Sequence, residues 1–224
     1  MAHSVRRHLD LEITAYDTAI RQFIRGYDSM IAEAAAAVAA VSPGHVIDLG
    51  AGTGALSEAL LAHASVGTVE LLDVDQEMLG QARIRLGGTN ERVRFTAGSY
   101  FEPLPPCDAV CASLSLHHIP SLSEKQALYQ RIRSALRPGG VFVNADVMIP
   151  SEGPEKDAEY RAWVHHNVEQ GIPEPQVWAN FESWAEEDTY YPVETELALL
   201  EEAGFQASCP WRAAPSTVVV AHCG

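Results

Sequence analysis

Short apolar runs alternate along the middle of the chain with segments whose apolar residues fall three or four positions apart. The runs predict strands at residues 45–49, 68–73, 93–97, 109–113 and 141–146. The helical spacing between them predicts helices at 54–63, 76–86 and 123–136. This alternation indicates a parallel sheet covered by helices on both faces. Right-handed crossovers bring the carboxyl ends of such strands to one edge, where we expect a ligand.

The pattern changes toward both ends of the chain. Near the start, helical spacing predicts helices at 5–24 and 27–41, separated by Gly26. Near the end, it predicts a helix at 193–203 that Gly204 stops, followed by strands at 205–211 and 216–221. The last two strands are close enough in sequence to form an antiparallel hairpin.

Residues 150–192 interrupt this rhythm and read as an irregular insertion after the fifth strand. Aromatic residues gather there, and Gly171, Pro173 and Pro175 forbid one continuous helix. The aromatic residues are Trp163, Trp178, Phe181, Trp184, Tyr190 and Tyr191. Two interpretations stand side by side: a lid that closes over a substrate, or aromatics that anchor the insertion to the body of the domain.

Length and composition favour one domain. The chain has 224 residues, of which 47% are hydrophobic, enough for a sizeable core. We expect a helical cap at 1–42, a cofactor-binding core at 43–149, a lid or substrate insertion at 150–192, and a helix and hairpin at 193–224.

No apolar run is long enough to cross a membrane, and the first residues lack the apolar core of a secretory signal. These features predict a cytoplasmic protein.

Charge argues against polyanionic partners. Lys and Arg number 15 against 30 Asp and Glu, a net charge of −15, which disfavours nucleic acid and anionic membranes. A local basic group at Arg83, Arg85, Arg92 and Arg94 reads as a solvated face. The four cysteines lack metal-binding spacing, so we expect reduced thiols.

The segment 46–54, VIDLGAGTG, predicts a buried strand that runs into a glycine turn and a helix. Gly50-x-Gly52-x-x-Ala55 satisfies a dinucleotide-binding pattern, and Asp73 ends the next strand, where it can accept two ribose hydroxyls. Asp48 favours a different adenosyl ligand, because its charge would repel a pyrophosphate and attract an ammonium group. The additional Gly54 keeps the turn open.

At this point the chain resembles the class I S-adenosylmethionine-dependent methyltransferases over nearly all its length, from about Asp10. The motifs, in order, are VIDLGAGTG, LLDVDQEML, GSYFEPLP, DAVCASLSLHHI and LRPGGVFV. Within that superfamily the chain is most similar to the carboxy-S-adenosylmethionine synthase group of the tRNA wobble-uridine pathway, through IRGYDSMI, SEKQALYQRIRSALRPGG, the His165-His166 pair and VETELALLEEAGF. The resemblance implies a Rossmann-like, doubly wound α/β sheet of seven strands, mostly parallel with the last antiparallel.

The resemblance also implies S-adenosylmethionine as cofactor and S-adenosylhomocysteine as product. Gly50, Gly52 and Gly54 would form the loop under the ribose and methionine part, and Asp48 would hold the loop and attract the ammonium. Asp73 would take the ribose hydroxyls. The remaining implied contacts are Val74 and Met78 on the adenine, Ser99 and Tyr100 near its amino group, and Ser113 and Tyr27 near the methionine part.

The chain departs from the synthase group at one point. That group holds the extra carboxylate of its product with an Arg in the insertion, where this chain has Phe181 or a neighbour. No Lys or Arg occurs between Arg161 and Arg212. A carboxylate there would lack a bidentate partner, so ordinary S-adenosylmethionine and methyl transfer are expected.

Methyl transfer to a hydroxyl needs a proton acceptor, and His117 and His118 follow the fourth strand at the expected ligand edge. A role in shaping the pocket is the alternative. With His165 and His166 they make two pairs that could hold a metal. No carboxylate or Cys stands beside them at ligand spacing, so we expect no metal.

Three functions remain open at this stage. The first is methyl transfer to oxygen, nitrogen or carbon of a small molecule, with Tyr16, Trp163, His166 and Trp178 as candidate substrate contacts. The second is synthesis of the carboxylated cofactor or tRNA modification. The third is a non-catalytic or nicotinamide-dependent Rossmann protein. An exposed aromatic insertion would also offer a contact for a homodimer.

Overall fold

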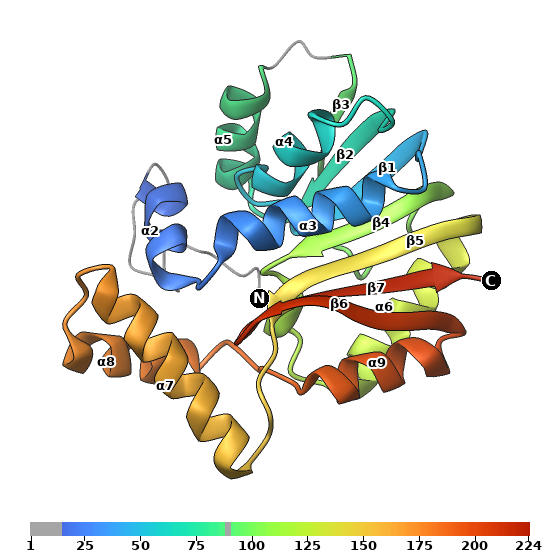
Figure 1. Ribbon diagram of the computed structural model, residues 1–224. Helices are drawn as coiled ribbons and strands as arrows, with labels where there is room; N and C mark the ends of the chain where they lie inside the picture. Colours follow the sequence, from blue (N-terminus) through green and yellow to red (C-terminus); the bar gives the residue numbers. More distant parts are fainter. Residues whose placement is uncertain (1–14, 88–90) are drawn as a thin grey trace.

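A seven-stranded sheet with strand order β3-β2-β1-β4-β5-β7-β6 runs through the structure, a computed structural model that describes residues 15–87 and 91–224 (Figure 1). The strands are β1 (His45–Leu49), β2 (Thr68–Asp73), β3 (Val93–Ala97), β4 (Cys107–Ser113), β5 (Leu136–Val147), β6 (Phe205–Ala213) and β7 (Ser216–Cys223). Strand β7 runs antiparallel to both neighbours, and the pairs from β3 to β5 are parallel. The prediction of a seven-stranded, mostly parallel sheet whose last strand is antiparallel is confirmed.

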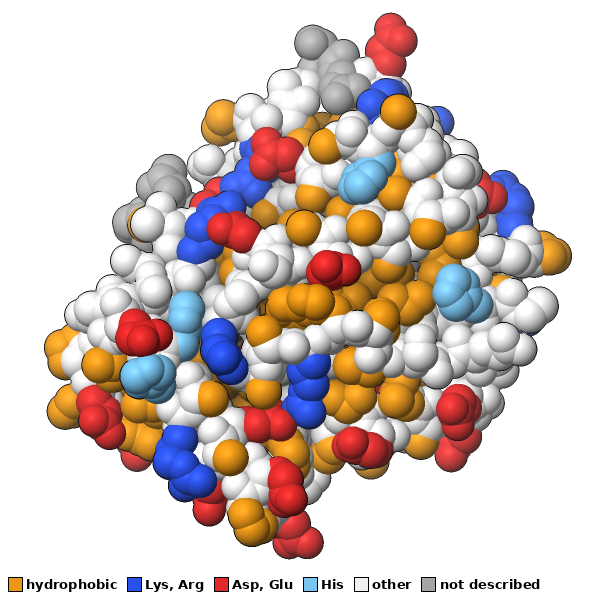
Figure 2. All heavy atoms as spheres, in the orientation of Figure 1, with side chains coloured by type: hydrophobic (Ala, Val, Ile, Leu, Met, Phe, Trp, Pro, Cys, Tyr) orange, Lys and Arg blue, Asp and Glu red, His pale blue; other side chains and the backbone are white. Residues whose placement is uncertain are grey.

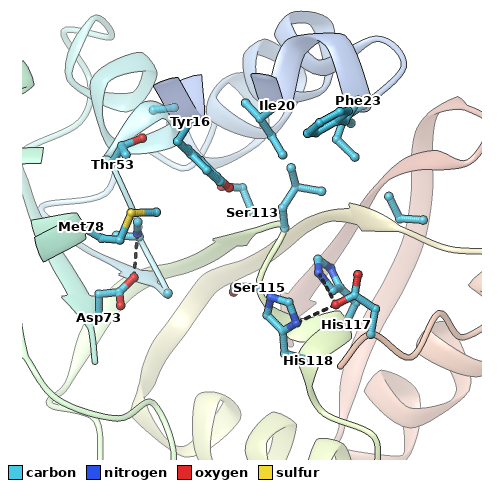
Figure 3. A pocket seen from close by; sticks show the side chains of 18 of the residues that line it. Tyr16, Ile20, Phe23, Thr53, Asp73, Met78, Ser113, Ser115, His117 and His118 are labelled. Atoms are coloured by element: carbon cyan, nitrogen blue, oxygen red, sulfur yellow. Dashed lines mark hydrogen bonds and ion pairs between the residues drawn. The ribbon is translucent and has the colours of Figure 1, made fainter. Parts of the chain in front are cut away.

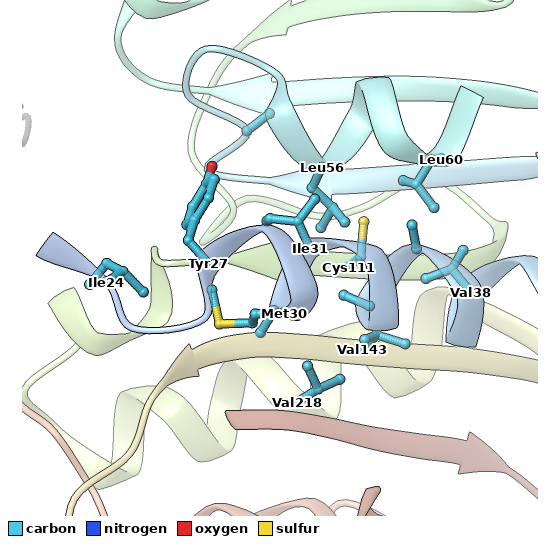
Figure 4. Close-up of a cluster of buried hydrophobic side chains, with 14 of the residues drawn as sticks. Ile24, Tyr27, Met30, Ile31, Val38, Leu56, Leu60, Cys111, Val143 and Val218 are labelled. Carbon is cyan, nitrogen blue, oxygen red and sulfur yellow. The ribbon is translucent and has the colours of Figure 1, made fainter. Parts of the chain in front are cut away.

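Both faces of the sheet are buried because successive strand residues alternate between two apolar layers. Val46 packs into one layer and Ile47 into the other. Helices α3 (Tyr27–Ala39), α4 (Ala55–Leu61) and α5 (Gln76–Leu86) cover the first face, and α6 (Leu122–Ala135) and α9 (Val193–Glu202) cover the second. Figure 4 shows the first layer, where side chains of α3 and α4 lie over the sheet.

Local sequence signals set the start of the helices that border the ligand edge. Asp75 caps α5, and its carboxylate accepts the backbone N–H groups of Glu77 and Met78 at 2.9 and 3.3 Å. Gly54 precedes α4 with φ +81°, a left-handed conformation that favours glycine. Both helices begin within a short turn of the carboxyl end of a strand, α4 after β1 and α5 after β2.

The insertion consists of two helices, α7 (Gly153–Glu169) and α8 (Glu174–Trp184), so the expectation of an irregular segment is wrong. The break between them follows the predicted signals, since Gly171 has φ +91° and Pro173 precedes α8. The buried residues Val177, Phe181 and Trp184 lie on one face of α8. In Figure 1 the pair projects beyond the sheet, near α2 (Tyr16–Phe23).

Helix α2 agrees with the end of the helix predicted at 5–24, and the part of that prediction at 5–14 lies outside the described residues. Strand β5 contains a bulge at 137–140, because the β4–β5 register jumps from Leu136 to Val141. Over the described ranges 15–87 and 91–224, the helices include none that could span a membrane. The four cysteines are free thiols in the structure.

Candidate functional site

A pocket of about 1130 Å³, including the space open to solvent, lies at the carboxyl ends of β1, β2 and β4. Figure 3 shows Asp73 and Met78 at one end, His117 and His118 at the other, and residues of α2 along the side between them. The lining also includes residues of the insertion. This is the edge at which the alternating strands and helices predict a ligand.

The glycine loop brings bare backbone to one wall of the pocket. Gly50 and Gly52 line it with φ of +61° and +54°, conformations that residues with a Cβ adopt with strain. A Cβ on Gly50 would lie 2.6 Å from the Cβ of Ser115, closer than packing allows. Gly54 lies outside the lining and shapes the turn from behind it, because its N–H donates to the carbonyl of Ala51 at 2.9 Å.

Asp73 lies in the lining beside this loop. Its carboxylate accepts the N–H of Gly52 at 2.8 Å and the N–H of Asp75 at 2.8 Å, so the backbone fixes its orientation. Burial raises the pKa of Asp73, and these hydrogen bonds partly offset the effect. A fixed carboxylate beside open backbone suits a ligand with two adjacent hydroxyls.

Asp48 does not line the pocket. It is fully buried below the loop, and its carboxylate accepts the hydroxyl of Ser57 at 2.6 Å. Burial raises the pKa of Asp48 to about 7. The side chain therefore supports the loop from the core side, as the resemblance implies, and it does not itself border the pocket.

Apolar and aromatic groups flank Asp73. Val74, Met78 and Tyr100 line the pocket, and so do Tyr27 and Ser113, as the resemblance implies. Ser99 lies outside the lining, because its hydroxyl turns back to accept the N–H of Phe101 at 3.1 Å. The contact expected for Ser99 is therefore absent among the residues that border this pocket.

Contacts of Asp17 hold helix α2 against the glycine loop. Its carboxylate accepts the hydroxyl of Thr53 at 2.6 Å and pairs with Arg85 of α5. These partners are 36 and 68 residues away, and sequence reasoning missed them because no local pattern signals such a contact. Tyr16, a predicted substrate contact, lines the pocket from the same helix.

The insertion supplies a second aromatic wall. Trp163 is 1% exposed, lines the pocket, and donates its indole N–H to the carbonyl of Phe23 at 2.6 Å. Trp184 packs edge-on against Phe23 with ring centroids 5.2 Å apart. These residues both anchor the insertion to α2 and border the pocket, so the lid and anchor interpretations describe the same side chains.

Two predicted substrate contacts lie elsewhere. Trp178 is 41% exposed, because it falls one residue off the buried stripe of α8. His166 lies outside the lining, and burial lowers its pKa against the opposing effect of hydrogen bonds with the backbone of Arg21 and Gln22. His165 is exposed and pairs with Glu169 at 3.1 Å. The structure thus separates the two histidine pairs.

The other histidine pair meets a carboxylate of the insertion that the sequence did not reveal. His117 Nδ1 lies 2.5 Å from Asp146 Oδ1 and its Nε2 lies 3.7 Å from Asp188 Oδ1. His118 Nδ1 lies 3.0 Å from the same Asp188 oxygen, and the hydroxyl of Tyr190 donates to Asp188 Oδ2 at 2.6 Å. Figure 3 shows both imidazoles at this end of the pocket.

Electrostatics gives the two histidines different roles. Burial lowers the pKa of His117, but the carboxylates of Asp146 and Asp188 outweigh it, and the net pKa is raised. The pKa of Asp146 is lowered by His117 against the opposing effect of burial. These carboxylates favour the protonated form of His117, and His118 is the better candidate for a proton acceptor.

No carboxylate stands at ligand spacing from this histidine pair in the sequence, but the fold brings Asp188 to it from a distant segment. Donor atoms of His117, His118 and Asp188 all lie within 4.8 Å of one another, close enough for a metal ion. Attraction between an imidazole and a carboxylate accounts for the same cluster without a metal, since His118 Nδ1 and Asp188 Oδ1 are at ion-pair distance, 3.0 Å.

Comparison with known proteins agrees with this geometry. A family model described as a methyltransferase domain matches residues 47–142. A carboxy-S-adenosyl-L-methionine synthase of Helicobacter hepaticus is 27% identical over 71% of this chain and 67% of its own length. The tetracenomycin polyketide synthesis 8-O-methyl transferase TcmO of Streptomyces glaucescens is 32% identical over 47% of this chain, a match that spans only 32% of TcmO.

Solved structures share the fold. An O-methyltransferase family protein from Burkholderia thailandensis superposes with a TM-score of 0.69 over 95% of this chain and 59% of its own, at 15% identity. Human N-acetylserotonin methyltransferase, solved in complex with S-adenosylmethionine, gives a TM-score of 0.60 over 100% of this chain and 63% of its own, at 17% identity. This chain therefore spans about three fifths of the length of these two structures.

Proposed function

We propose that this chain is a class I S-adenosylmethionine-dependent methyltransferase, which transfers the methyl group of S-adenosylmethionine to a small-molecule acceptor in this pocket. The observation that carries the proposal is one pocket with Asp73 and the glycine loop at one end and the His117–His118 pair at the other. Donor and acceptor can thus meet in a single cavity.

The residues at the Asp73 end fit the methyl donor. Asp73 would accept the ribose hydroxyls, and the backbone at Gly50 and Gly52 would approach the ribose and methionine part. Val74, Met78 and Tyr100 would border the adenine, and Tyr27 and Ser113 the methionine part. Asp48 and Gly54 would act through the loop that they support. S-adenosylmethionine supplies an activated methyl group on a positively charged sulfur.

The residues at the other end would orient the acceptor and take its proton. Asp188 faces His118 Nδ1 at 3.0 Å, which favours the tautomer that carries hydrogen on Nδ1 and the lone pair on Nε2. In that tautomer His118 can accept a proton from an acceptor hydroxyl. His117, held between two carboxylates, would stabilise the negative charge of Asp188.

The alternative functions receive less support. The described lining contains no Lys or Arg to hold the extra carboxylate of a carboxylated cofactor. Two of the four arginines that were expected to form a solvated face already have partners within the protein. Arg85 pairs with Asp17, and Arg92 donates to three backbone carbonyls. On the face in Figure 2, Lys and Arg side chains stand among Asp and Glu, which disfavours a nucleic-acid acceptor.

Three broader expectations accompany the proposal. We expect a cytoplasmic enzyme that folds as one domain with the segment boundaries given above. A homodimer would use the exposed side of the insertion, where Val168 and Trp178 are 42% and 41% exposed. Sedimentation of the purified protein at several concentrations tests this expectation.

Calorimetric titration tests the proposed donor. S-adenosylmethionine and S-adenosylhomocysteine should bind wild-type protein, whereas Asp73→Ala should bind each at least about 30-fold more weakly because the ribose loses its fixed acceptor. NAD serves as the control ligand. Binding of NAD with no response to either sulfur compound would contradict the proposal and favour a nicotinamide-dependent protein.

A further inference from the structure

Helix α2 runs along the pocket from the Asp73 end, which is the donor end of the proposed function, to the histidine end, which is its acceptor end. In Figure 3, Tyr16 lies toward Thr53, whereas Phe23 lies toward the histidine pair. Both aromatic residues line the pocket, and so does Ile20 between them. The eight residues of α2 span about 12 Å. One helix therefore borders both ends of the cavity.

Each end of α2 is held by a different part of the protein. In its first turn, the Asp17 carboxylate accepts the hydroxyl of Thr53 at 2.6 Å, a contact with the glycine loop. At its last residue, the carbonyl of Phe23 accepts the indole N–H of Trp163 at 2.6 Å and the side-chain amide of Asn167 at 3.0 Å. Helix α2 thus connects the glycine loop to α7 of the insertion.

Asn167 is fully buried on α7 and does not border the pocket. Its amide nitrogen donates to the carbonyl of Phe23 and to the carbonyl of Trp163, both at 3.0 Å. Trp163 and Asn167 are four positions apart, so they lie on the same face of α7. The carbonyl of Phe23 is one of those that a helix leaves without an internal partner at its end. Asn167 therefore caps α2 and lies beside the tryptophan that borders the acceptor end.

The insertion is also tied to the rest of the protein at both of its ends. In the first half of α7, Glu159 pairs with Arg212 of β6. After α8, the N–H of Thr189 donates to the carbonyl of His117 at 2.8 Å. Between these points the insertion lies against α2, through the bonds to the last carbonyl of α2 and an edge contact of Trp184 (Figure 1). Movement of this middle part without α2 would leave buried donors of α7 without their acceptor, which is unfavourable.

We infer that Asn167 is a positioning residue that joins the insertion to α2, so that a donor bound at the glycine loop orders the acceptor end. This inference rests on the proposed methyl transfer and adds a connection between its two ends. A ligand at the donor end favours the docked position of α2, because Tyr16 borders the same cavity and Asp17 contacts the loop that the ligand touches. Docked α2 in turn places the Phe23 carbonyl against the donors of α7.

Backbone hydrogen exchange, followed by mass spectrometry with and without S-adenosylhomocysteine, tests this connection. With the ligand at about 100 times its Kd, an opening that releases the ligand becomes about 100-fold rarer, whereas an uncoupled opening is unchanged. In wild type, the ligand should slow exchange at least about tenfold in α2 and in residues 163–184 of the insertion. Asn167→Leu should keep the slowing in α2 and reduce it to less than about threefold in the insertion.

Asn180→Leu is the matched control, because Asn180 lies in α8 and its amide oxygen accepts from Gln176 of the same helix. This variant should respond to the ligand as wild type does. A purely structural role of Asn167 would change exchange by the same factor with and without the ligand. Equal slowing of the insertion in Asn167→Leu and wild type, or no slowing of the wild-type insertion while the ligand is bound, would overturn the inference.

The opposite end of α2 offers a second test of the same connection. Asp17→Ala, studied at saturating ligand, should reduce the slowing both in α2 and in the insertion, because it removes the contact between α2 and the glycine loop. Slowing of the insertion as in wild type would contradict the inference. If Asn167→Leu does not fold, the smaller Asn167→Ala removes the same amide and is expected to give the same result.

Calorimetry on wild type precedes these measurements and separates the two claims. Failure of wild type to bind S-adenosylhomocysteine contradicts the proposed function. Binding without a slowing of exchange in the insertion contradicts this inference alone.

Discussion

Substitution of Asp48 by Asn should change how the stability of this protein depends on pH. Asp48 is fully buried, and burial raises its pKa from 3.8 to about 7. Between these two values the folded state holds a proton that the unfolded state has lost, so stability falls as pH rises toward 7 and then levels off. Asn has nearly the same shape, can accept the Ser57 hydroxyl, and does not titrate.

The size of the effect follows from the pKa shift. The pKa of Asp48 is 3.8 in the unfolded state and about 7 in the folded state. Ionisation of this carboxyl therefore lowers the free energy of unfolding by about 2 kcal/mol between pH 5.5 and pH 8. The free energy of unfolding of Asp48→Asn, relative to wild type, should therefore increase by about that amount over the same range.

Urea denaturation at pH 5.5, 7 and 8 measures this difference directly. Asp157→Asn, at an exposed residue of α7, is the matched control and should run parallel to wild type. If the curves of Asp48→Asn and wild type also run parallel, then the buried carboxyl does not titrate as the structure indicates, and the reasoning is refuted.

Three further variants test separate parts of the site. Gly50→Ala should lower the free energy of unfolding by roughly 2 kcal/mol in urea, because φ is +61° and Ser115 Cβ blocks the new methyl; unchanged stability would contradict this. Asp17→Ala should weaken S-adenosylhomocysteine about tenfold by calorimetry, whereas exposed Asp28→Ala should not, and equal effects would refute a fastening role for Asp17. Asp188→Asn should lower kcat for a hydroxyl acceptor about 100-fold and leave S-adenosylhomocysteine affinity intact; loss of wild-type activity with EDTA would indicate a metal instead.

Much of the fold could be predicted because its signals are local. The strand from His45 to Leu49 is mostly apolar with one buried acid, and the glycines after it are needed for positive φ. The same locality places Gly50, Gly52 and Asp73 at the pocket, since Asp73 ends one strand and the two glycines lie just after another. Strand ends gather at one edge whatever the details of side-chain packing.

The acceptor end was harder to predict because its partners are distant in sequence. Asp188 is 70 residues from His118, and no spacing rule joins them. The error at Trp178 could have been avoided, because Val177, Phe181 and Trp184 follow the helical period and Trp178 does not. Composition showed that aromatics gather in the insertion, and only their periodicity separates buried residues from exposed ones.

A crystal structure with S-adenosylhomocysteine tests the central claim most directly. We expect the Asp73 carboxylate at hydrogen-bond distance from both ribose hydroxyls, the backbone of Gly50 and Gly52 against the ligand, and the sulfur facing the end of the pocket that holds His118. A ligand bound elsewhere, or one whose ribose lies apart from Asp73, would contradict the account.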